Sequence, residues 1–197
     1  MGDSNFGRIR FGEGRGSVGA ATPGLKDWSA KVDDIIPSKS RSYRNVVVMC
    51  GTNDLKHPME NEDEEILTIY KKYKGKFEEV RKLNPKCKLF VCPVLPTRDQ
   101  SINVRIVKFN KLIFSDLAKS NLYVSVVHGF AEFVDRSNGL LKQTHYEQRS
   151  ENDVLHINDN GYRLLVRCIK SAIFTSRSQQ GERSVGRPTY SQVVRPV

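Results

Sequence analysis

Three short polar segments of this chain carry residue types that could together perform acyl transfer. Ser4 offers a hydroxyl nucleophile, His156 offers a base beside it, and Asp153 offers a carboxylate that would orient the base. The reaction also needs N–H donors for the oxyanion. Asn53 can donate from its side-chain amide, and Gly19 and Ser4 from their backbones. We therefore predict catalytic roles for Ser4, Asp153 and His156. The predicted oxyanion hole consists of Ser4, Gly19 and Asn53.

Each of these segments is weak evidence when it is taken alone. A single histidine is more often a structural residue than a catalyst, because perturbed functional sites are a minority. The segment 51–54 reads equally well as a turn with an Asx cap for the next helix. Their order and placement strengthen the interpretation, since all three fall at predicted loop positions beside core elements.

An unbroken apolar run leads directly into the second of these segments. Residues 46–50 are Val-Val-Val-Met-Cys, without polar alternation and rich in β-branched side chains. Such a run predicts a strand buried on both faces, as in a parallel sheet. The polar residues 51–54 then lie at the carboxyl end of that strand, where ligands bind in open α/β sheets.

Strands and amphipathic helices alternate along the rest of the chain. Their order predicts an α/β fold, a three-layer α/β/α sandwich with a doubly wound parallel sheet. The glycine-rich residues 1–20 predict irregular backbone with one short strand near Val18. The spacing of apolar residues predicts strands at 46–50, 88–95 and 122–127, and helices at 25–36, 60–83, 103–119 and 159–174.

Composition limits the class of protein further. No apolar run is long enough to span a bilayer, and the N-terminus shows no signal peptide. Four cysteines without a CxxC pair predict free thiols in a reducing compartment, so we expect an intracellular, cytoplasmic protein without a bound metal. The formal charge of +10 permits contact with nucleic acid, although solvated lysines are the commoner explanation. The basic tail, 175–197, is predicted to be disordered.

The same segments resemble the sequence motifs of the SGNH or GDSL-type hydrolases. The first family motif, Gly-Asp-Ser, matches residues 2–4, and the third, Gly-x-Asn-Asp, matches residues 51–54. The last motif, Asp-x-x-His, matches residues 153–156 and precedes a closing helix. The second motif supplies a glycine N–H, for which Gly19 is our choice and Gly24 is the competitor.

The resemblance covers residues 1–174, which we treat as one hydrolase-like domain followed by the tail, 175–197. It implies a flavodoxin-like sandwich and the hydrolysis of a small or lipid-like ester or thioester, without metal or cofactor. The four motifs and the basic tail are also similar to the esterase domain in the first open reading frame of some non-LTR retrotransposons.

One departure from the family pattern concerns the start of the chain. In the family a buried strand precedes Gly-Asp-Ser, whereas only Met1 precedes it here. We expect this first strand to be missing, and activity to depend on what takes its place. The alternative function is therefore a catalytically weak or inactive module of the same fold that binds RNA or a protein partner.

Overall fold

Three parallel strands form the sheet within the part of the chain that the structure describes. The computed structural model describes residues 44–49, 51–119, 124–135, 141–147 and 156–184, and the strands run in the order β1-β2-β3. They are β1 (Asn45–Val48), β2 (Lys88–Val91) and β3 (Val124–Val126). In the register, Val46 faces Leu89, and Leu89 faces Val124 on its other side. The predicted parallel sheet is confirmed.

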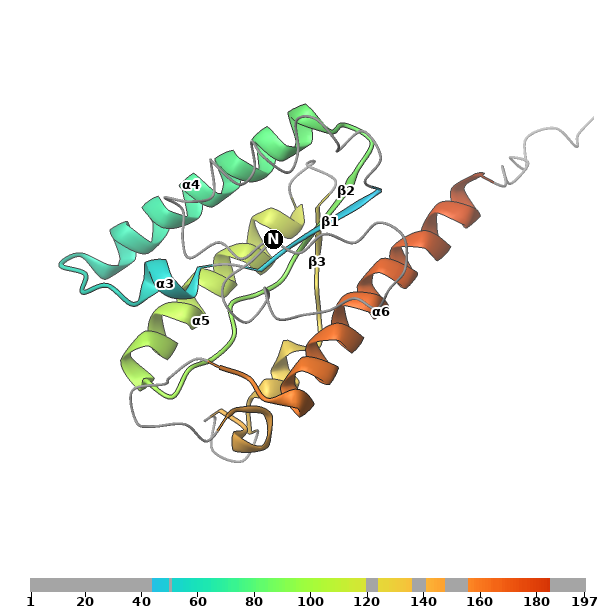
Figure 1. Cartoon of the computed structure of the whole chain (residues 1–197). Coiled ribbons are helices and arrows are strands. Elements are labelled where there is room, and N and C mark those ends of the chain that lie inside the picture. The colour runs from blue at the N-terminus through green and yellow to red at the C-terminus, as the bar shows by residue number, and fades with distance from the viewer. Residues whose placement is uncertain (1–43, 50, 120–123, 136–140, 148–155, 185–197) are drawn as a thin grey trace, which may run out of the picture.

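Helices cover both faces of the sheet, as the sequence predicts. Figure 1 shows α4 and α5 on one side of the strands and α6 on the other, which makes three layers. Among the described residues, the α-helices are α3 (Thr52–Leu55), α4 (Glu62–Leu83), α5 (Gln100–Ser115) and α6 (Asp159–Ser184). Short 3-10 turns lie at Leu117–Lys119, Phe130–Phe133 and Gln143–His145. No helix within these ranges has the length and apolar composition needed to cross a bilayer.

Alternate residues of each strand enter two separate hydrophobic clusters. Val48 and Val91 pack in one cluster with the apolar faces of α4 and α5. Met49 and Phe90 point the other way and pack in a second cluster with α6. Successive side chains of a strand point to opposite faces. The covering of both faces explains the uninterrupted apolar runs at 46–48 in β1 and 89–91 in β2.

Several element ends differ from the sequence prediction for identifiable reasons. Strand β2 stops at Val91, not at residue 95, because Pro93 has no N–H for the ladder. Helix α5 begins at Gln100, three residues early, because the Asp99 carboxylate caps it by accepting the N–H of Ser101 at 2.8 Å.

The last helix is longer than the sequence suggests. The apolar spacing predicts an end at residue 174, whereas α6 runs to Ser184. Ser176 lies beyond the predicted end and is bonded to β2. Its carbonyl and hydroxyl oxygens each accept a hydrogen bond from the Lys88 ammonium at 2.7 Å. The division into 1–174 and 175–197 remains a prediction. The helix predicted at 25–36 and the strand near Val18 lie outside the described residues.

The packing predicts a large stability difference between two phenylalanines of α5. Phe109 is 1% exposed, and its ring meets the rings of Tyr70 and Tyr73 edge-on at 6.2 and 5.7 Å between centroids. Phe109→Ala should lower the free energy of unfolding by about 3–5 kcal/mol, the usual cost of such a cavity. Phe114, 39% exposed, is the matched control and should cost about 1 kcal/mol or less when changed to Ala. Urea unfolding of both variants measures the difference; equal losses would contradict this packing.

Candidate active site

Gly51 connects β1 to the short helix α3, and its backbone requires a glycine. Its φ angle is 127°, in a region that L side chains rarely adopt. A Cβ placed here would lie 2.9 Å from Val94 Cγ2 and 3.4 Å from the Phe109 ring. The first residue of the Gly-x-Asn-Asp motif therefore lets β1 turn into α3 directly against the exit of β2.

Helix α3 carries Asn53 and is held mainly by its neighbours. It has only four residues, and the Leu55 N–H donates to the Gly51 carbonyl at 3.0 Å. The Tyr73 hydroxyl, from α4, donates to the Asp54 carboxylate at 2.5 Å. Tyr73 is 1% exposed, so this bond joins α3 to the core. Asn53 is half-buried between these two anchors.

Two asparagines of α5 hold the segment that follows β2. The Asn110 side chain accepts the Val94 N–H at 2.8 Å and donates to the Val94 carbonyl at 2.9 Å. Asn103 does the same for Thr97, with both bonds at 2.7 Å. These pairs satisfy backbone groups that the sheet no longer serves. The segment that follows β2 is therefore held in place against α5.

His156 lies on a short antiparallel bridge that leads into α6. Tyr146 and Ile157 pair, and the His156 carbonyl accepts the Glu147 N–H at 2.9 Å. Two residues later, the Asn158 side chain accepts the N–H groups of Asn160 and Gly161 at 3.0 and 3.1 Å. This arrangement is an N-terminal cap of α6. The bridge and the cap thus hold the backbone from the His156 carbonyl onward.

The bridge that carries His156 is attached to the exit of β2. The Tyr146 hydroxyl, on a side chain that is 2% exposed, donates to the Pro96 carbonyl at 2.8 Å. Burial raises the pKa of Tyr146 well above its ordinary value, so it remains a donor. The Arg98 guanidinium also donates to the Glu147 carbonyl at 2.5 Å. His156 is therefore held at the carboxyl edge of the sheet.

The structure places two of the predicted site residues at this edge. Asn53 lies just after β1, and the segment with His156 is bonded to the residues after β2. Ser4, Gly19 and Asp153 lie outside the described residues, as does Gly24. The catalytic roles of all these residues, Asn53 and His156 included, and the complete triad remain predictions.

Most of the residues that hold Asn53 and His156 in place are not recognisable from the sequence. Asp54 lies inside the recognised motif, but Tyr73, Asn103, Asn110 and Tyr146 belong to no motif. Only the two asparagines leave a signal in the sequence. Asn103 and Asn110 are seven residues apart on α5, and Asn110 lies on the apolar side of that helix. A polar side chain on a buried helix face needs a partner there, and the sequence does not say which one.

Two other histidines have structural surroundings. His128 is exposed, with its ring 5.7 Å from that of Phe114. His145 packs edge-on against Phe133, and burial and the nearby Lys142 lower its pKa. Within the described ranges, no three His, Cys, Asp or Glu side chains are grouped so that they could hold a metal ion.

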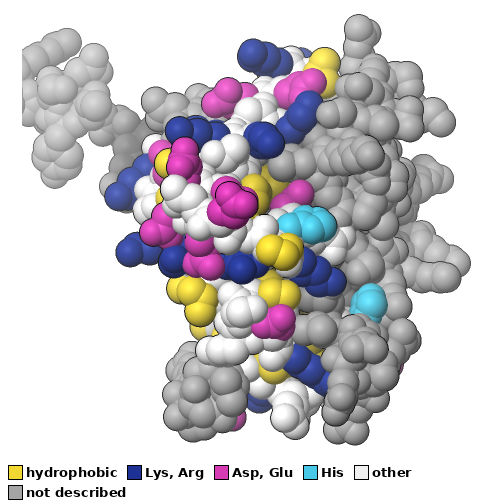
Figure 2. Space-filling view, turned by 90° about the vertical axis from the view of Figure 1, so that its left-hand side faces the viewer, with side chains coloured by type: hydrophobic (Ala, Val, Ile, Leu, Met, Phe, Trp, Pro, Cys, Tyr) yellow, Lys and Arg dark blue, Asp and Glu magenta, His cyan; other side chains and the backbone are white. Residues whose placement is uncertain are grey.

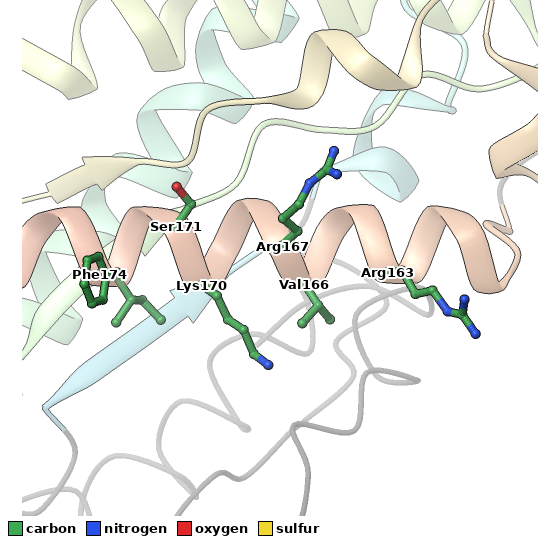
Figure 3. Close-up of a pocket in the computed structure, with 7 residues that line it drawn as sticks. Arg163, Val166, Arg167, Lys170, Ser171 and Phe174 are labelled. Atoms are coloured by element: carbon green, nitrogen blue, oxygen red, sulfur yellow. The ribbon is translucent and has the colours of Figure 1, made fainter.

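A cavity of about 710 Å³ borders α6. In Figure 3, Val166 and Lys170 point to one side of the helix, and Arg167 and Ser171 point to the other. The described lining also includes Arg163, Ile173 and Phe174. Neither of the two described candidates, Asn53 and His156, is among these residues.

Comparisons with known proteins bear on the fold. No protein-family model matches the chain, and no curated protein matches it. One similar solved structure is a protein from Streptococcus pneumonia described provisionally as a platelet activating factor. It has a TM-score of 0.69 and 19% identity over 86% of this chain and 80% of that chain.

A second similar structure is a carbohydrate esterase family 3 protein from Talaromyces cellulolyticus. It has a TM-score of 0.52 and 18% identity over 79% of this chain and 69% of that chain. At these identities the likeness concerns the fold. It confirms the three-layer α/β/α fold that the sequence predicts.

Alanine substitutions at two glycines compare the turn beside the site with an ordinary position in a helix. Gly51→Ala should destabilise the protein by about 1–3 kcal/mol, because the new Cβ meets Val94 and φ is unfavourable. At Gly75, within α4, an added Cβ would meet no atom within 4 Å. Gly75→Ala should therefore stabilise by about 0.5–1 kcal/mol. Chemical unfolding measures the change in the free energy of unfolding for both variants. A Gly51→Ala protein as stable as the parent would contradict the described turn.

Proposed function

We propose that this chain, with its SGNH-type fold, is a serine esterase or acyl hydrolase that cleaves a carboxylic ester or thioester. The observation that carries the proposal is the common support of Asn53 and His156 at the carboxyl edge of the sheet. An amide donor and an imidazole at that edge are two of the groups that acyl transfer needs.

The proposed reaction assigns one role to each residue. His156 takes the proton of the Ser4 hydroxyl as its oxygen attacks the carbonyl carbon, and Asp153 orients the imidazole. The resulting oxyanion accepts N–H groups from the Asn53 side chain and from the backbones of Ser4 and Gly19. His156 then protonates the leaving alcohol or thiol, and water releases the acyl group by the reverse sequence. The substrate is a small or lipid-like ester, and the steps need neither metal nor cofactor.

The structural likeness supports this class of reaction. One similar structure is a carbohydrate esterase, and its fold resembles this chain over 79% of the length. Fold does not fix function, so the residues of the site carry the proposal. Asn53 and His156 both occupy positions of the family motifs.

A module that binds RNA through a basic surface has less support from the described residues. The face in Figure 2 carries Lys and Arg side chains intermixed with Asp and Glu. Lys108 lies 2.8 Å from Glu62 and 2.7 Å from Asp63, so its charge is locally compensated. A backbone-binding surface would instead present Lys and Arg clustered along one face.

Ester hydrolysis by two histidine variants tests the proposal. With p-nitrophenyl acetate, His156→Ala should abolish the enzyme-catalysed rate, because no base would remain to activate Ser4. His128→Ala is the matched control, since the exposed His128 contacts Phe114 and should leave the rate unchanged. Equal rates for the His156 variant and the parent would exclude His156 as the base.

Removing the proposed oxyanion donor tests a different part of the same site. Asn53→Ala should lower kcat about 100- to 1000-fold, the usual loss for one oxyanion donor. KM should change little, because the donor acts mainly on charge that develops in the transition state. Steady-state kinetics separates the two constants. A higher KM with normal kcat would assign Asn53 to ground-state binding.

A further inference from the structure

We propose that Arg105 of α5 is a positioning residue that holds Asn53 in place for catalysis. The inference rests on the proposed function and assigns a role to a residue outside every recognised motif. Arg105 does not touch the reacting atoms. It acts through α3, the four-residue helix in which Asn53 lies.

The Arg105 guanidinium joins three groups at the end of α3. One terminal nitrogen, Nη1, donates to the Leu55 carbonyl at 3.1 Å and to the His57 carbonyl at 2.8 Å. The Nε atom donates to the Glu62 carboxylate at 3.1 Å. The Arg105 side chain is 15% exposed, and its bonds to Leu55 and Glu62 are partly buried, whereas its bond to the His57 carbonyl is exposed.

Helix α3 needs this support because it is so short. The last carbonyl groups of a helix have no partner within the helix, and in four residues they are most of the carbonyls. Leu55 is the final residue of α3, and its carbonyl is such a group. A cation is favourable at a helix C-terminus, and the arginine fork can serve two acceptors at once. Arg105 therefore closes the end that the Gly51 and Asp54 contacts leave open.

Glu62 fixes the guanidinium in turn. The carboxylate accepts Arg105 and Lys108 together, and these hydrogen bonds, first from Lys108 and then from Arg105, lower the pKa of Glu62. Lys108 also donates to Asp63 at 2.7 Å. Lys108 thus shares the helix, the charge and the Glu62 partner of Arg105, but no bond joins it to α3 among those described. This makes Lys108 a matched control.

Loss of Arg105 should affect the reaction through the placement of the Asn53 amide. An oxyanion donor works only when it is aimed at the charge that develops in the transition state. Misplacement by about 1 Å can cost about 100-fold in rate. Because the donor contributes little to ground-state binding, the loss should appear in kcat and not in KM.

The first test compares Arg105→Gln with Lys108→Gln in steady-state hydrolysis of p-nitrophenyl acetate. Arg105→Gln should lower kcat about 10- to 100-fold with KM unchanged, whereas Lys108→Gln should leave both constants unchanged. In an Asn53→Ala background, Arg105→Gln should cause no further loss, because the group that it positions is already gone. Arg105→Lys, which keeps the charge without the fork, should recover part of kcat. Equal effects of the two glutamine variants, or a full further loss without Asn53, would overturn the proposal.

A second readout does not depend on activity. The Leu55 amide donates within α3, so its hydrogen exchange reports whether the helix is closed. Arg105→Gln should speed exchange at Leu55 about tenfold or more relative to Lys108→Gln. Unchanged exchange at Leu55 in Arg105→Gln would overturn the proposal that Arg105 clamps the end of α3. If the parent chain hydrolyses no ester while exchange at Leu55 responds as expected, the proposed function fails and the clamp on α3 stands.

Discussion

The two hydrogen bonds between the Asn110 side chain and the backbone of Val94 support the rest of the candidate site. They fix the exit of β2 at 2.8 and 2.9 Å, on the side of α5 that faces the core. Gly51 packs against the Val94 side chain, and α3 with Asn53 starts from Gly51. The position of Asn53, the proposed oxyanion donor, and the turn at Gly51 that leads to it from β1 therefore both depend on Val94.

The same exit segment supports the proposed base. Two residues after Val94, the Pro96 carbonyl accepts the Tyr146 hydroxyl, and Tyr146 pairs with the residue that follows His156. Parallel strands end at a common edge, and the described polar contacts bring the later segment back to that edge. The site is therefore assembled by buried side-chain bonds to backbone groups, which are costly to leave unpaired.

The sequence predicted the sandwich because uninterrupted apolar runs, at 46–50 and 89–95, alternate with long helices that are apolar on one face. Val48 and Met49 show why, since they enter different clusters. It also singled out Asn53 and His156 as candidates, because they lie in recognisable motifs. It did not identify Asn110, Tyr73, Tyr146 or Arg105, whose partners are 16 to 50 residues away along the chain. Such pairings depend on tertiary packing, which local spacing does not encode. The roles of Ser4, Gly19, Asn53, Asp153 and His156 remain predictions from the sequence.

Covalent modification by a fluorophosphonate tests the proposed serine chemistry more directly than any rate measurement. Such a probe reacts with a serine only when a neighbouring base and oxyanion donors activate it. Peptide mass mapping of the whole chain should find the adduct on Ser4, and on no serine in the His156→Ala protein. An adduct on another serine, or none on a folded protein that still hydrolyses esters, would contradict the assignment of Ser4 and His156.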